Sequence, residues 1–124
     1  MIENQKKKVF DLEERTGLFG ENVLGFCKSV KKDNVANPVI IQLVRSATSI
    51  GANYCEADCA ESRKDFEHKL SICKKESKET RYWLRMLKVI LPESLPEIQA
   101  LWQEANELQL IFISIIKKSK ENNN

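Results

Sequence analysis

Residues 63–91, RKDFEHKLSICKKESKETRYWLRMLKVIL, decide the fold because an apolar or small residue returns at every third or fourth position. This interval brings side chains back to one face of an α-helix. The predicted core stripe of the segment consists of Phe66, Leu70, Cys73, Ser77, Thr80, Leu84, Leu87 and Leu91. A helix of about 30 residues spans roughly 45 Å. Ser62 followed by Asp65 predicts the helix start, since both side chains can bond to the exposed amides there.

Three other segments carry the same periodicity, so the sequence predicts helices at about 9–32, 38–59, 63–91 and 96–120. The first two stripes are Val9, Leu12, Thr16, Phe19, Val23, Phe26 and Val30, then Ala36, Ile40, Leu43, Ala47, Ile50, Tyr54 and Ala57. The last stripe is Ile98, Leu101, Ala105, Leu108, Phe112 and Ile115. Lys31 and Lys32 are expected to end the first helix, and Pro38 suits the first turn of the second. The β-branched run at 39–44 continues its heptad without interruption, which argues against a strand.

The length and composition favour one soluble domain. A chain of 124 residues with only 4 Gly and 3 Pro is suited to a few long helices with short connections. We therefore expect an all-α, antiparallel, up-down-up-down, left-handed four-helix bundle over residues 1–124. The sequence lacks an apolar leader and any membrane span of roughly 18 residues, so the expected location is the cytoplasm, without a membrane partner. The four cysteines fall within helical patterns and are expected to be reduced thiols.

Apolar residues beside the stripes indicate a second buried surface, most simply between identical subunits. They are Val44, Trp83, Val89, Trp102, Leu110, Ile111 and Ile116. Arg45, Ser49, Ala52 and Glu56 lie on another face of the second helix, where small residues flanked by opposite charges could fix the register of a partner helix. We interpret this set as an oligomer interface, and a contact within the protomer, or exposed pairs one turn apart, is the alternative.

Five cations form the clearest surface pattern. Lys74, Lys78, Arg81, Arg85 and Lys88 are spaced by four, three, four and three residues, which places them along one side of the third helix. Such a basic ridge can follow nucleic-acid phosphates, with Lys6 to Lys8 adding charge from an N-terminal arm. The alternative is an ordinary solvated helix face paired with Glu76 and Glu79.

The sequence assigns no catalytic residue, metal or cofactor. Cys55 and Cys59 are four residues apart, but there is no second close pair to complete a zinc site, and buried structural thiols are the simpler interpretation. Arg63 and His68 are similar to the R-x4-H motif of HEPN ribonucleases, which cleave RNA without metal. Five residues rotate two helical side chains by about 140°, so this pair is not expected to converge on one substrate.

Several motifs resemble those of a known bacterial family, the four-helix-bundle proteins of 23S rRNA intervening sequences. The residues that carry the resemblance are Arg45-Ser46-Ala47-Thr48-Ser49-Ile50-Gly51-Ala52-Asn53, Glu56, Ser62, Asp65-Phe66, Leu70-Ser71 and Glu79-Thr80-Arg81-Tyr82-Trp83-Leu84. A glycine usually follows the glutamate that corresponds to Glu56, whereas this chain has Ala57. The turn at 57–62 is therefore left open, including an extension of the preceding helix by one turn.

The resemblance implies a homopentamer of antiparallel four-helix protomers that binds RNA or an associated protein. The fold is also similar to the accessory variability protein of diversity-generating retroelements, a basic pentamer whose partners are a reverse transcriptase and nucleic acid. The expected function is that of a nonenzymatic oligomeric accessory protein that binds RNA or DNA through the basic ridge. A protein-binding assembly scaffold and a HEPN-like ribonuclease are the alternatives.

Overall fold

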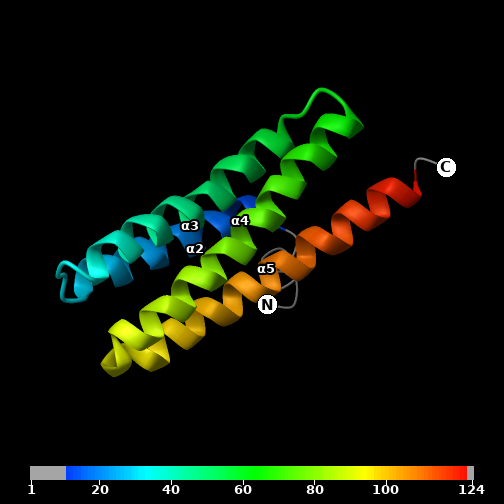
Figure 1. Ribbon diagram of the computed structural model, residues 1–124. Coiled ribbons are helices and arrows are strands. Elements are labelled where there is room, and N and C mark those ends of the chain that lie inside the picture. The colour runs from blue at the N-terminus through cyan, green and yellow to red at the C-terminus, as the bar shows by residue number, and fades with distance from the viewer. Residues whose placement is uncertain (1–10, 123–124) are drawn as a thin grey trace, which may run out of the picture.

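The computed structural model describes residues 11–122, and all regular structure in this range is helical. Four long helices make up the fold: α2 (Leu12–Ser29), α3 (Ala36–Asp58), α4 (Arg63–Ile90) and α5 (Leu95–Glu121). A single 3₁₀ turn, η1 (Pro92–Ser94), links α4 to α5 in this part of the chain. Figure 1 shows the helices as long rods lying side by side, with α2 behind α3.

The first helix is shorter than the predicted range of 9–32. The Asp11 carboxylate accepts a hydrogen bond from the Glu14 amide at 3.1 Å, and this cap starts α2 at Leu12. Val9, the first residue of the predicted stripe, lies outside the described residues. The helix ends at Ser29, so the prediction that Lys31 and Lys32 end it is wrong: both lysines follow the helix, and Lys28 is the basic residue of its last turn.

Side-chain caps also fix the starts of the next two helices. Asp33 Oδ1 accepts from the amides of Val35 and Ala36, at 3.0 and 2.8 Å, which starts α3 two residues before the predicted position. The Ser62 hydroxyl accepts from the Asp65 amide at 3.0 Å, as expected for the start of α4. Helix α3 ends at Asp58, so it does not extend by a further turn into the segment 57–62, whose conformation the sequence left undecided.

Side-chain contacts join α3 to α4, and α4 to α5, at two or more points along each pair. Between α3 and α4, Thr80 donates to Ser46 at 3.0 Å, and Lys69 donates to Glu56 at 2.9 Å, so the order of contacts reverses along the two helices. Between α4 and α5, Ser119 donates to Glu67, and Arg81 donates to Gln109. Helix α2 reaches α5 through Arg15, whose guanidinium bonds both carboxylate oxygens of Glu104 at 2.8 Å. The left-handed twist stays a prediction.

A glycine allows α2 and α3 to pack closely. A Cβ atom at Gly51 would lie 3.4 Å from the carbonyl oxygen of Thr16, at the boundary between a tight and an ordinary van der Waals contact. On the opposing helix, a Cβ at Gly20 would meet the Thr48 backbone at 3.9 Å, which is an ordinary contact. Gly51 therefore allows the backbones of α2 and α3 to approach each other closely.

The predicted stripes form the core. The largest side chains that are almost fully buried are Phe19, Phe112, Leu43, Ile50, Leu70, Leu84, Leu87, Ile98 and Leu108. Tyr54 is half-buried, and its ring lies 6.4 Å from the Phe112 ring, joining α3 to α5. Of the apolar residues beside the stripes, Val44, Trp83, Trp102 and Ile111 pack against this core. Within the described residues, none of the helices carries an apolar stretch long enough to span a membrane.

One stripe residue was predicted at the wrong position. Ile116 is 8% exposed and belongs to the core, whereas Ile115 packs beside it. A straight α-helix has 3.6 residues per turn, so Ile116, 18 residues after Ile98, returns to the same side after about five turns. The heptad spacing used to choose Ile115 drifts from this period over several turns.

Candidate nucleic-acid interface

One side of α4 faces away from the other helices and carries mostly positive charge. Its exposed residues include Lys75, Lys78, Tyr82, Arg85 and Lys88, which we call the outer basic face. They are spaced by three, four, three and three residues, so Lys78, Tyr82 and Arg85 lie within about 60° of one another around the helix, with Lys75 and Lys88 on either side of them. None of the four cations forms an ion pair with another residue in the range 11–122. The positive charge of the outer basic face is therefore not neutralised by ion pairs with the described residues.

The two acidic residues in the same stretch of α4 turn toward α3. Arg45 of α3 forms ion pairs with Glu79 at 2.5 Å and with Glu76 at 3.7 Å. The Glu76 side chain is only 6% exposed, and its Oε2 atom has no hydrogen-bond partner among the described residues. Burial, followed by the charge of Glu79, raises the pKa of Glu76, and Arg45 opposes this shift. The negative charges of Glu76 and Glu79 are thus directed toward Arg45 of α3, and they do not neutralise the cations of the outer basic face.

Arg81, a member of the predicted ridge, makes contacts between helices. Its guanidinium donates to Gln109 Oε1 of α5 and lies over the Trp102 ring, 5.4 Å from the ring centroid. The side chain is half-buried, and its Nε atom is buried without a hydrogen-bond partner in the described structure. Arg81 therefore joins α4 to α5, and its charge is turned away from the outer basic face.

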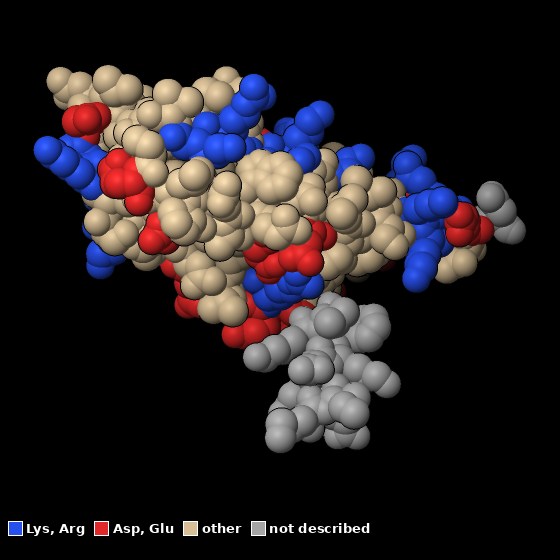
Figure 2. Space-filling view, turned by 90° about the horizontal axis from the view of Figure 1, so that it is seen from below, with Lys and Arg blue, Asp and Glu red and all other residues tan. Residues whose placement is uncertain are grey.

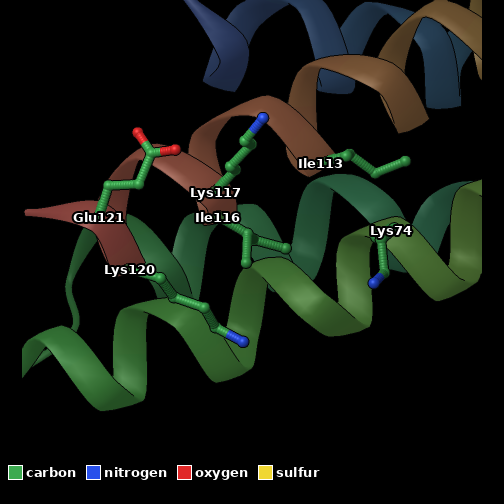
Figure 3. A pocket seen from close by; sticks show the side chains of 6 residues that line it. All are labelled: Lys74, Ile113, Ile116, Lys117, Lys120 and Glu121. Carbon is green, nitrogen blue, oxygen red and sulfur yellow. The ribbon is translucent and has the colours of Figure 1, made fainter.

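Lys74, the first residue of the predicted ridge, also lies toward α5. It borders a groove of about 400 Å³ near the end of α5, lined by Lys74, Ile113, Ile116, Lys117, Lys120 and Glu121. Figure 3 shows Lys74 on α4 and Lys120 on α5 at the groove, with Ile116 between them, whereas Lys117 and Glu121 point away from Lys74. The groove therefore combines two isoleucines with three lysines and one glutamate.

The predicted ridge is thus divided by the structure. Lys78, Arg85 and Lys88 lie exposed on the outer basic face, whereas Lys74 and Arg81 lie at the boundary with α5. Sequence reasoning missed Lys75 and Tyr82, which occupy the centre of the exposed side. They could have been found by taking the direction opposite to the core stripe of the same helix.

Figure 2 shows the resulting charge distribution on one face of the molecule. Basic side chains follow its upper edge and gather at the C-terminal end, while acidic side chains lie along the lower edge and, mixed with basic ones, at the other end. With 20 basic and 18 acidic residues, the net charge is only +2, so any attraction to a polyanion must arise from this separation.

Most of the predicted oligomer interface contacts α4 of the same chain. Arg45 pairs with Glu79, and the Ser49 hydroxyl favours the charged form of Glu76 and so opposes the rise in its pKa. Glu56 pairs with Lys69 at 2.9 Å, and this bond raises the pKa of Lys69. Ala52 is exposed beside the shallow groove between α2 and α3. These contacts match the intramolecular alternative, and a role between subunits stays a prediction.

The cysteines and the only histidine form no cluster in the described structure. Cys27 and Cys73 are buried, and burial raises the pKa of their thiols to about 11 and about 12, respectively. Cys55 and Cys59 are exposed, so the interpretation of these two as buried thiols is wrong. Within residues 11–122, no three His, Cys, Asp or Glu residues are placed to hold a metal ion.

The structure places Arg63 and His68 in different surroundings. Arg63 lines a pocket between the α3–α4 turn and the end of α5, together with Lys118 and Ser119. His68 is exposed and is not among the residues that line this pocket.

Comparisons with known proteins identify a family. Residues 18–114 match the family described as 23S rRNA-intervening sequence protein. A solved structure is also similar, that of a protein of unknown function from the S23 ribosomal protein family of Bacteroides thetaiotaomicron VPI-5482. The two have a TM-score of 0.75 and 33% sequence identity, over 85% of this chain and 97% of that chain. No match was found among curated proteins.

Proposed function

The chain belongs to the 23S rRNA-intervening sequence protein family, and we propose that it is a nonenzymatic, oligomeric accessory protein that binds RNA or DNA. The proposed contact surface is the outer basic face of α4. The observation that carries the proposal is the separation of charge on this helix: Lys75, Lys78, Arg85 and Lys88 face outward, whereas Glu76 and Glu79 are held by α3.

This arrangement suits a phosphate backbone. Cations from Lys75 to Lys88 follow the helix for about 20 Å, so they can meet successive phosphates along one strand. Each phosphate that is neutralised releases condensed counterions, which favours binding without base recognition. Because the four side chains form no ion pair with the described residues, binding does not require an existing pair to be broken.

Assembly is the second part of the proposal. Ile41, Val89 and Leu110 are 63%, 81% and 57% exposed, and large apolar side chains at such positions support a contact with another protein. We propose a homo-oligomer of left-handed, up-down-up-down protomers, in the pentameric form that the family resemblance implies, acting in the cytoplasm. A reverse transcriptase or another protein is a candidate partner of the assembly. A monomer in a measurement of solution mass would contradict this part.

Charge reversal tests the nucleic-acid surface. The double variant Lys78→Glu/Arg85→Glu is expected to bind a labelled RNA or DNA oligonucleotide about 10- to 30-fold more weakly at constant salt, because two phosphate contacts become repulsive. Fluorescence anisotropy measures the change. The matched control is Lys28→Glu/Lys64→Glu, which alters net charge equally at two exposed positions outside the outer basic face.

The control is expected to retain an affinity close to that of the wild type. Equal weakening of both double variants would show that net charge alone governs binding, and the assignment of the surface would be wrong. A wild-type protein that retains no nucleic acid in a salt-dependent way would favour the protein-binding scaffold.

A further inference from the structure

We propose that the outer basic face selects single-stranded over double-stranded nucleic acid, because Tyr82 supplies a ring on which an unpaired base stacks. This inference rests on the proposed function and adds the class of nucleic acid to it. Tyr82 is 50% exposed and lies on the same side of α4 as Lys78, four residues before it, and Arg85, three residues after it. The aromatic ring is therefore placed between two cations.

The neighbouring residue holds the tyrosine ring in place. The rings of Tyr82 and Trp83 meet edge to face, with centroids 4.9 Å apart and an interplanar angle of 77°. Trp83 packs against the core, and its indole nitrogen donates to Glu79 Oε1 at 3.3 Å. Glu79 is in turn paired with Arg45. Because the contact is edge to face, Trp83 supports the tyrosine without stacking on it.

The burial pattern indicates that the exposed ring is not required by the protomer core. Residues of α4 that pack inward, such as Leu84 and Leu87, are fully buried, whereas Tyr82 points to the opposite side. An exposed aromatic side chain surrounded by unpaired cations is the combination found in proteins that bind single strands, where bases stack on rings and phosphates meet lysine and arginine. We therefore assign the stacking role to Tyr82 and the phosphate contacts to Lys78 and Arg85.

A duplex cannot use this ring in the same way. Its bases are stacked on one another, so their faces are unavailable, and only the phosphate backbone can meet the cations. A single strand can place phosphates near Lys78 and Arg85 and turn one base onto Tyr82. The preference for single strands should thus come from the ring, while the salt dependence comes from the cations.

The test compares Tyr82→Ala and Tyr82→Phe in the full chain. The probes are a 12-nucleotide oligouridine and an RNA duplex of 12 base pairs, measured by anisotropy at one salt concentration. Tyr82→Ala is expected to weaken single-strand binding about 5- to 100-fold, because stacking on an aromatic side chain is lost. Tyr82→Phe retains the ring and should bind like the wild type. Duplex affinity and the salt dependence of single-strand binding should be unchanged in both variants.

Two results would overturn the inference: equal loss for Tyr82→Ala and Tyr82→Phe, or equal loss of single-strand and duplex binding in Tyr82→Ala. The charge-reversal variant separates this failure from that of the proposed function. If Lys78→Glu/Arg85→Glu weakens binding while Tyr82→Ala binds both probes like the wild type, only the stacking role fails. If neither variant changes binding, the outer basic face is not the nucleic-acid surface.

Discussion

Replacing Phe112 with alanine is expected to lower the free energy of unfolding by about 3–5 kcal/mol, the range measured when a large aromatic side chain is removed from a protein core. Phe112 is fully buried, and its ring lies 6.4 Å from the Tyr54 ring of α3. Removing it leaves a cavity where α5 meets the rest of the bundle. Urea denaturation, followed by far-ultraviolet circular dichroism, measures the loss.

The next residue supplies a matched control. Ile113 is 42% exposed on the same helix, so Ile113→Ala removes less buried surface and should change the free energy of unfolding by less than about 1 kcal/mol. Similar losses for the two variants would mean that Phe112 does not occupy the core position described above. The register in which α5 packs against α3 and α4 would then differ from the one described here.

Arg45→Met is the second large effect, with an expected loss of about 2–3 kcal/mol at pH 7.5. The variant keeps most of the aliphatic side chain but leaves Glu76 and Glu79 close together without their common cation. Most of the loss is expected to come from Glu76, because its side chain is only 6% exposed and one of its oxygens already lacks a hydrogen bond within the described structure. Thermal or urea unfolding at a fixed protein concentration measures the loss.

The pH dependence of this loss has a definite sign. The pKa of Glu76 is raised in the folded protein, so near pH 5 the folded state binds more protons than the unfolded state. Stability from this group therefore falls as pH rises through the interval between the ordinary pKa and the raised one. Arg45→Met should consequently be less damaging at pH 5 than at pH 7.5, because protonation removes the uncompensated charge.

A second substitution tests whether the effect is local. Adding Glu76→Gln to Arg45→Met should recover part of the lost stability, since the buried charge is then absent. A loss that is independent of pH and is not rescued by Glu76→Gln would contradict the role given to the cluster. If the loss depended instead on protein concentration, the predicted role of Arg45 between subunits would be supported.

The helices and most of the core could be predicted from periodicity. A residue such as Leu84 repeats at helical spacing with its neighbours, and burial of that stripe is the main stabilising contribution in a bundle. The exact ends of the helices were harder to predict, because the caps made by Asp11 and Asp33 are local hydrogen bonds that the heptad pattern does not indicate. Ile116 replaced Ile115 in the core for a related reason, since a straight helix departs from a heptad over several turns.

The candidate surface was only partly predictable. Spacing placed Lys78, Arg81 and Arg85 along one side of α4, but the sequence does not state where the neighbouring helix lies. Arg81 meets Gln109 and Trp102 because α5 packs on that side. Lys75 and Tyr82 lie opposite the core stripe of α4, a direction that the sequence contains but that the spacing of the predicted cations does not indicate. Charge spacing on one helix defines a band of residues, and tertiary packing decides which of them remain exposed.

The salt dependence of nucleic-acid binding by the wild-type protein tests the central claim most directly. Affinity for a 12-nucleotide RNA should be measured by anisotropy from about 50 to 300 mM salt, where counterion release governs the change. If Lys75, Lys78, Arg85 and Lys88 each meet a phosphate, log K should fall linearly with log salt with a slope of about −2 to −3. Absence of binding at the lowest salt, or an affinity that does not change with salt, would contradict the account.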